Sequence, residues 1–261
     1  MPDNTPTILA LDFDGVICDG MNEYFQITKR TYFQIWDSNT ILNDDLAPAF
    51  YRLRPVIETG WEMPILLRAI ALKISEEKIL QNWSKVAQEI IELEQLDPKE
   101  VSYKLDSIRD EWIESDLESW LALHRFYPGV IERIRQILNS EIKFYIVTTK
   151  EDRFVKKLLQ QQEIELPEEL IFGKKYKRPK YEIVRQLIEK SLVDPANFWF
   201  VEDRLEALEL VRQQADLQAI KLYLADWGYN TQQTRDSLRD RQDIKLLSLK
   251  QFNQNFSDWD K

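Results

Sequence analysis

The sequence contains almost none of the residues that build disulfides, zinc sites and thiol or imidazole catalytic centres. Its 261 residues include one cysteine, Cys18, and one histidine, His124. A single cysteine excludes an intramolecular disulfide and favours a reducing compartment. The same counts exclude a zinc site rich in cysteine or histidine. Any metal ion bound by this chain is therefore expected to be a hard cation held by oxygen atoms.

The chain also lacks an excess of positive charge. It carries 35 Lys and Arg against 45 Asp and Glu, a net charge of −10, and its sequence pI is about 4.9. This balance argues against a general nucleic-acid-binding protein, because such proteins neutralise phosphates with basic residues. Residues 1–6 are polar, and Asp12 and Asp14 interrupt the apolar stretch that follows, so neither a signal peptide nor a membrane span is indicated. We expect a cytoplasmic protein with no nucleic-acid or membrane partner.

Core-forming residues, in contrast, are plentiful and regularly patterned. Hydrophobic residues make up 44% of the chain, enough for one large domain or two modest ones. Short apolar runs at residues 7–12, 143–148, 198–201 and 220–224 predict buried strands, and amphipathic helical patterns lie between the later ones. Such alternation predicts an α/β fold with a parallel sheet covered on both faces. The polar residues after these strands are then expected at one edge of the sheet.

The stretch from residue 21 to residue 124 contains no convincing strand and is predicted to be helical. Apolar residues recur every three or four positions across 79–93 and again across 101–112, which is typical of one-sided helices. Ser75 and Asp97 are the expected N-caps of these two helices. We therefore predict an α/β core formed by residues 1–20 and 125–261, and an all-helical domain, residues 21–124, inserted after the first strand.

Two carboxylates at the end of the first strand are the strongest chemical signal. Asp12-Phe13-Asp14-Gly15-Val16 could direct one carboxylate at a substrate as nucleophile and keep the second nearby as an acid or base. The alternatives are a plain acidic loop or a calcium loop. The calcium loop is disfavoured because Asn22 occupies the position where its glutamate would be required.

Together with three later segments, this motif resembles the haloacid dehalogenase superfamily. Ile146-Val147-Thr148-Thr149 is similar to the second motif of that family, and Phe200-Val201-Glu202-Asp203 is similar to the fourth. Tyr127-Pro128-Gly129-Val130 resembles the return from the cap to the core. The resemblance implies a Rossmann-like core and a helical cap of the C1 type.

The resemblance also implies roles for individual residues. Asp12 would be the nucleophile that forms an aspartyl-phosphate, Asp14 the acid and base, and Thr148 a hydrogen-bonding partner of the phosphoryl group. A Mg²⁺ ion would be held by Asp12, the main-chain carbonyl of Asp14, and Asp203, with Glu202 binding directly or through water. Clustered carboxylates also call for a divalent cation on electrostatic grounds.

The third motif, a cation that pairs with phosphate and nucleophile, falls in a strongly basic segment. This segment reads Lys174-Lys175-Tyr176-Lys177-Arg178-Pro179-Lys180. The Lys-Pro dipeptide typical of the family aligns best with Arg178-Pro179, which makes Arg178 the first candidate and Lys180 the second, with Lys177 also open. The other cations of this segment are expected to be solvated.

The function favoured by these residues is a Mg²⁺-dependent phosphatase that acts on a small phosphorylated metabolite, as a monomer or homodimer. A phosphomutase or a phosphonate-cleaving enzyme of the same fold stays open, and the latter would use a cap lysine such as Lys29. A third alternative is a non-enzymatic binding or regulatory protein. Retention of both Asp12 and Asp14 speaks against it, because a binder does not need a nucleophile together with its acid.

Overall fold

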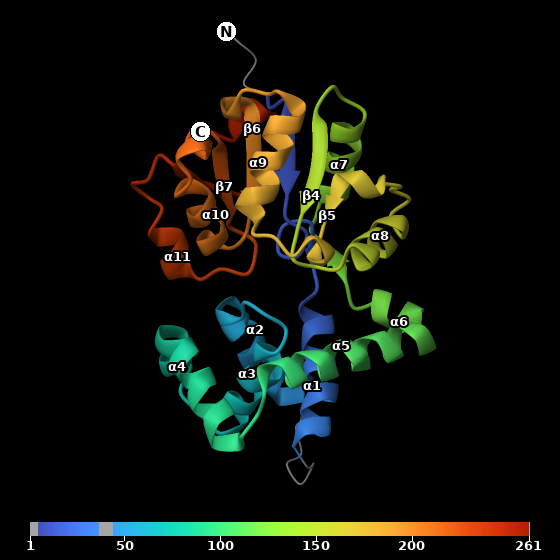
Figure 1. The fold of residues 1–261 in the computed structure, drawn as a ribbon, viewed down its shortest axis with the longest axis vertical. Helices are drawn as coiled ribbons and strands as arrows, with labels where there is room; N and C mark the ends of the chain where they lie inside the picture. The colour runs from blue at the N-terminus through green and yellow to red at the C-terminus, as the bar shows by residue number, and fades with distance from the viewer. Residues whose placement is uncertain (1–4, 37–43, 261) are drawn as a thin grey trace. The chain divides into compact units, whose positions relative to one another are not determined.

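The computed structural model describes residues 5–36 and 44–260. The chain folds into two compact units. The first, called the core unit below, comprises Met1–Asp19 and Arg125–Lys261, and the second, called the helical unit, comprises Gly20–His124. Figure 1 shows the elements of each unit.

The core unit is built on a six-stranded sheet with the order β5-β4-β1-β6-β7-β8, in which every neighbouring pair is parallel. This confirms the predicted α/β fold with a parallel sheet. The strands are β1 (Ile8–Leu11), β4 (Lys143–Val147), β5 (Ile171–Phe172), β6 (Phe198–Glu202), β7 (Lys221–Ala225) and β8 (Ile244–Leu247). The helices of this unit are α7 (Val130–Leu138), α8 (Asp152–Gln160), α9 (Lys180–Ser191), α10 (Leu205–Arg212), α11 (Gln232–Asp236) and α12 (Leu249–Phe252).

Strand β1 lies at the centre of this sheet, between β4 and β6, and its four residues are fully buried. A strand covered on both faces reads as a continuous apolar run, which is why the sequence pattern identified it. On one face, Ile8 and Ala10 pack in a hydrophobic cluster with residues of α9 and α10 (Figure 1). Trp199 of β6 and Tyr223 of β7 contact a C-terminal aromatic group that includes Trp259.

Three features of the core unit were not predicted. Strand β5 has only two residues, and β8 lies in the polar tail beyond Asn230, which carried no signal in the sequence. A short antiparallel ladder pairs β2 (Cys18–Asp19) with β3 (Arg125–Phe126). This ladder brings together the two points at which the chain leaves the core unit and returns to it.

The helical unit contains α1 (Met21–Ile35), α2 (Ala47–Leu53), α3 (Glu62–Ala71), α4 (Glu76–Glu94), α5 (Pro98–Ser115) and α6 (Leu117–Leu121). Both predicted N-caps are confirmed: the Ser75 side chain accepts a hydrogen bond from Lys78 N, and the Asp97 side chain accepts one from Lys99 N. Among the described residues, no helix is long and apolar enough to span a membrane.

Candidate active site

The ends of three adjacent strands bring the predicted site residues together. Asp12 follows β1, Thr148 follows β4, and Glu202 and Asp203 stand at the end of β6. The backbone N–H of Asp12 donates a hydrogen bond to Val201 O in the adjacent strand β6, at 2.9 Å. Because the carboxyl ends of parallel strands form the usual ligand-binding edge of such a sheet, these side chains occupy the expected location for a site.

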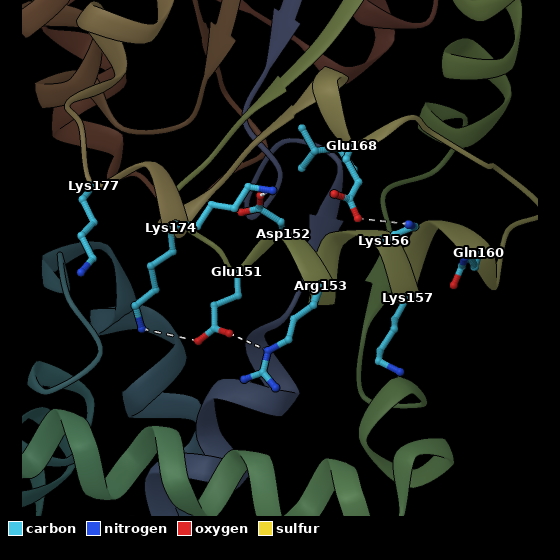
Figure 2. Close-up of a pocket in the computed structure, with 11 residues that line it drawn as sticks. Glu151, Asp152, Arg153, Lys156, Lys157, Gln160, Glu168, Lys174 and Lys177 are labelled. Carbon is cyan, nitrogen blue, oxygen red and sulfur yellow. Dashed lines mark hydrogen bonds and ion pairs between the residues drawn. The ribbon is translucent and has the colours of Figure 1, made fainter.

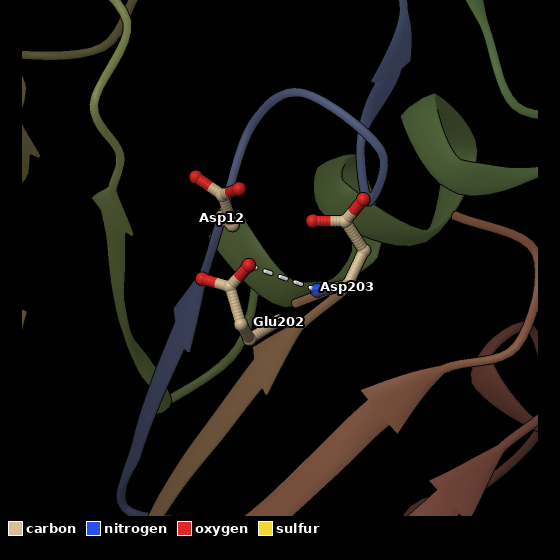
Figure 3. A group of neighbouring side chains, drawn as sticks. All are labelled: Asp12, Glu202 and Asp203. Carbon is tan, nitrogen blue, oxygen red and sulfur yellow. Dashed lines mark hydrogen bonds between the residues drawn. The ribbon is translucent and has the colours of Figure 1, made fainter. Parts of the chain in front are cut away.

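Three carboxylates at this edge form a compact acidic cluster. One oxygen each from Asp12, Glu202 and Asp203 can be chosen so that all three lie within 4.8 Å of one another. Figure 3 shows Asp12 arriving from β1, and Glu202 and Asp203 from the end of β6. The exposed fractions of the three residues are 6%, 1% and 1%, so water screens their repulsion little.

The raised pKa values of Asp12 and Asp203 indicate that burial and mutual repulsion disfavour the charged forms of these carboxyl groups. Burial raises the pKa of Asp12 to about 7; the charge of Glu202 adds to this rise and that of Lys180 opposes it. Burial, followed by the charges of Glu202 and Asp12, raises the pKa of Asp203 well above its ordinary value. Buried, crowded carboxylates of this kind are stabilised by a hard divalent cation, which prefers oxygen ligands. The donor set therefore fits such an ion.

Lys180 contacts two carboxylates of the acidic cluster. Its Nζ lies 2.9 Å from Asp12 Oδ1 and 2.5 Å from Glu202 Oε2, and only 11% of its side chain is exposed. Burial acts to lower the pKa of Lys180, but the charges of Asp12 and Glu202 outweigh burial and raise it. The lysine therefore stays charged and partly neutralises the acidic group.

This placement reverses the predicted order of the third-motif candidates. Arg178 is exposed and donates a hydrogen bond to Gln186 Oε1 at 3.0 Å, and Lys177 is also exposed. Pro179 is the N-cap of α9, so Lys180 occupies the first helical position, from which it reaches the ends of β1 and β6. Of these candidates, Lys180 contacts Asp12, whereas Arg178 contacts Gln186.

Glu202 pairs with Lys180 and also accepts hydrogen bonds from the backbone of the following turn. Its Oε1 accepts hydrogen bonds from the backbone N–H groups of Asp203 and Arg204, each at 3.0 Å. Its other oxygen, Oε2, faces Lys180. Both carboxylate oxygens are thus engaged, and Glu202 orients the turn that presents Asp203.

Asp203 is fixed by a close-fitting loop. Its Oδ2 accepts a hydrogen bond from Tyr229 N at 2.6 Å. Gly15, whose φ is +86°, leaves room for the carboxylate, because a Cβ there would lie 2.0 Å from Asp203 Oδ2. A Cβ at Gly228 would lie 2.3 Å from Asp203 Cβ. The loop from Asp226 to Tyr229 therefore holds Asp203 in place.

Asp14 and Thr148, the remaining site residues expected from the sequence, both contact Lys150, which the motifs did not indicate. Lys150 Nζ lies 3.1 Å and 3.3 Å from the two carboxylate oxygens of Asp14. The Lys150 backbone N–H donates to Thr148 Oγ1 at 3.2 Å. Thr148 is 4% exposed, and its hydroxyl can still donate to a phosphoryl oxygen. The signal available in the sequence was the position of Lys150, two residues after the second-motif threonine.

Cys18 and His124 lie in environments that favour structural roles over catalytic ones. Burial raises the pKa of the Cys18 thiol, which disfavours a thiolate nucleophile. His124 Nδ1 lies 3.0 Å from Trp120 O within the helical unit.

A cavity of about 600 Å³ lies within the core unit, between α8 and the turn at Lys174–Tyr176. Figure 2 shows its charged lining, in which Glu151 bridges Arg153 and Lys174 at 2.7 Å and 3.7 Å. Lysines predominate over acids here, and Lys177 lines the same cavity. The exposed part of the basic segment therefore borders a recess separate from the acidic cluster.

Comparison with protein families matches residues 6–210 to a family described as haloacid dehalogenase-like hydrolase. The chain therefore belongs to the haloacid dehalogenase-like hydrolases, as its motifs indicated. The family assignment covers β1 through most of α10 and thus every strand that contributes to the acidic cluster. A comparison with curated proteins finds no match.

Solved structures with the same fold are distant in sequence. A putative haloacid dehalogenase-like hydrolase from Bacteroides fragilis is 15% identical, with a TM-score of 0.58, covering 94% of this chain and 98% of that one. A putative phosphoglycolate phosphatase from Lactobacillus delbrueckii subsp. bulgaricus is 12% identical, with a TM-score of 0.60 and coverage of 94% and 95%. A predicted phosphoglycolate phosphatase from Haemophilus somnus is 13% identical, with a TM-score of 0.60 and coverage of 99% and 97%. At these identities the likeness establishes the fold.

Proposed function

We propose that the protein is a Mg²⁺-dependent phosphatase that hydrolyses a small phosphorylated metabolite through an aspartyl-phosphate on Asp12. The observation that carries this proposal is the contact of Asp12 with Lys180 beside two further buried carboxylates. A nucleophilic carboxylate, a fixed cation and a set of metal ligands are the parts that phosphoryl transfer requires. The names of the phosphoglycolate phosphatase structures are consistent with this reaction class.

Binding of the phosphoryl group uses residues already fixed in place. Lys180, at the first position of α9, would attract the phosphoryl oxygens, orient the Asp12 side chain and favour its ionised form. The Thr148 hydroxyl would donate to another phosphoryl oxygen. Asp12, Asp203 and the Asp14 carbonyl would hold Mg²⁺, with Glu202 supporting them, and the ion would supply positive charge to offset that of the phosphoryl oxygens.

The chemistry then needs two displacements at phosphorus. In the first, an Asp12 carboxylate oxygen attacks phosphorus, the bond to the ester oxygen breaks, and Asp14 gives its proton to that leaving oxygen. In the second, the Asp14 carboxylate takes a proton from water as the water oxygen attacks phosphorus, and the bond between Asp12 and phosphorus breaks. Inorganic phosphate leaves, and both aspartates return to their starting states.

The helical unit, Gly20–His124, is proposed to act as a cap of the C1 type. Both of its connections to the core unit adjoin the ladder between β2 and β3, which ties them together. Because the two connections are adjacent, β2 and β3 could together form a hinge. Closure of a cap would exclude water and select the leaving group.

Phosphate release from a panel of phosphorylated metabolites tests the proposal. Wild-type protein would be assayed with Mg²⁺ and with excess chelator, beside Asp12→Asn and the surface control Arg178→Met. We expect turnover that requires Mg²⁺, survives Arg178→Met and is lost in Asp12→Asn. Turnover that persists in Asp12→Asn, or folded wild type that releases no phosphate from any member, would overturn the assignment.

A further inference from the structure

Lys150 forms a bidentate ion pair with Asp14 that links residues 136 positions apart. Its Nζ lies 3.1 Å from Asp14 Oδ1 and 3.3 Å from Asp14 Oδ2. The exposed fractions of the two side chains are 7% for Lys150 and 15% for Asp14. Both carboxylate oxygens face the same ammonium group, so the contact restrains the rotation of the carboxyl group as well as its position.

The backbone of Lys150 is itself held by residues around the site. Its N–H donates to Thr148 Oγ1 at 3.2 Å, and its carbonyl accepts from Lys174 N at 2.9 Å. Gly173 allows the second contact, because a Cβ there would lie 2.6 Å from the Lys150 carbonyl oxygen. Lys150 thus lies at the junction between the end of β4 and the segment that leads to Lys180.

We propose that Lys150 is a positioning residue that sets the carboxyl group of Asp14 for proton transfer to and from the reacting oxygens. This inference rests on the proposed function, in which Asp14 protonates the leaving oxygen and later deprotonates water. Lys150 would touch neither the phosphoryl group nor the metal. It would act only through Asp14, whose side chain lies on a loop rather than on a strand.

The positioning role predicts a dependence on the leaving group. When the P–O bond of an alkyl phosphate breaks, the departing alkoxide needs the proton of Asp14. A nitrophenolate leaves without that proton because its negative charge is already stabilised by the ring. Misplacing a general acid therefore slows the first displacement for the alkyl ester and spares it for the aryl ester.

The experiment compares kcat/KM, which reports the first displacement, for an alkyl phosphate and for p-nitrophenyl phosphate. The variants are Lys150→Met, Lys150→Arg and Asp14→Asn, with Lys157→Met on α8 as a matched loss of a lysine. For Lys150→Met we expect a loss of about tenfold to 100-fold on the alkyl ester and less than about threefold on the aryl ester. Lys150→Arg should recover part of the loss, and Lys157→Met should change neither value.

A double-mutant cycle separates positioning from a general loss of structure. In the Asp14→Asn background, Lys150→Met should cause no further loss on the alkyl ester, because its target is already gone. Equal losses on both esters, or additive losses in the cycle, would overturn the positioning role while leaving the phosphatase assignment intact. The alkyl phosphate is a substrate found in the metabolite panel, and folded wild type that releases no phosphate from any member of that panel would overturn the phosphatase assignment and the positioning role together.

Discussion

Removing the charge of Lys180 should destabilise the protein far more than removing that of Arg178. In Lys180→Met, Asp12 and Glu202 lose the ammonium group that lies 2.9 Å and 2.5 Å from their oxygens. Breaking a buried pair in this way costs about 3–5 kcal/mol, because the remaining charges stay buried without compensation. Arg178→Met removes an exposed guanidinium that contacts Gln186, so its effect should stay within about 0.5 kcal/mol.

Urea unfolding at pH 8 in chelator measures both free energies without a contribution from bound metal. At that pH the carboxylates carry the most charge, so the difference between the two variants should be largest. It should shrink as the pH falls towards 5, since Asp12, whose pKa is about 7 even with Lys180 present, takes up a proton. Equal free energies for Lys180→Met and Arg178→Met at pH 8 would refute the placement of Lys180 in the acidic cluster.

Three further predictions follow from charges and close contacts. The folded-state pKa of Asp12 is raised from 3.8 to about 7, so metal-free wild type should lose stability relative to Asp12→Asn as the pH rises from 4 to 7. Urea unfolding should show a loss on the order of 3 kcal/mol, and a difference that does not change with pH would contradict this prediction. Hydrogen bonding to Arg241 lowers the pKa of Asp243 to about 2. The stability lost in Asp243→Asn, roughly 0.5–1 kcal/mol at this partly exposed pair, should therefore be present above pH 4 and vanish as the pH falls through 2. Gly228→Ala should lower the free energy of unfolding by about 2–3 kcal/mol and weaken Mg²⁺ binding measured by calorimetry. The control Gly60→Ala, whose Cβ would lie 3.7 Å from its nearest neighbour, should do neither. Intact Mg²⁺ binding in Gly228→Ala would contradict the role of the loop from Asp226 to Tyr229 in holding Asp203.

The strands that carry the site were predictable because burial on both faces makes them continuous apolar runs. Strands β1, β4, β6 and β7 all overlap the predicted runs. Strand β8 was missed because Lys245 interrupts it and the surrounding tail is polar. Two-residue β5 is too short to show any period.

Within the site, the acidic residues followed from the strand ends, whereas the partners of those acids did not. Lys180 and Arg178 are both plausible in a basic segment, and only the start of α9 at Lys180 decides which one reaches Asp12. Lys150 and Asp14 are 136 residues apart, so their contact depends on the pairing of β1 with β4. Sequence spacing locates residues along one strand or helix but does not specify which cation meets which carboxylate across the sheet.

The most direct test of the central claim is to trap the phosphorylated enzyme. Asp14→Asn lacks the base that activates water, so p-nitrophenyl phosphate carrying radioactive phosphorus should label this variant faster than the label is released. Proteolysis after acid quenching should recover the label on Asp12, and the double variant Asp12→Asn/Asp14→Asn should stay unlabelled. Label on any other residue, or label that survives loss of Asp12, would contradict the assignment of Asp12 as the nucleophile.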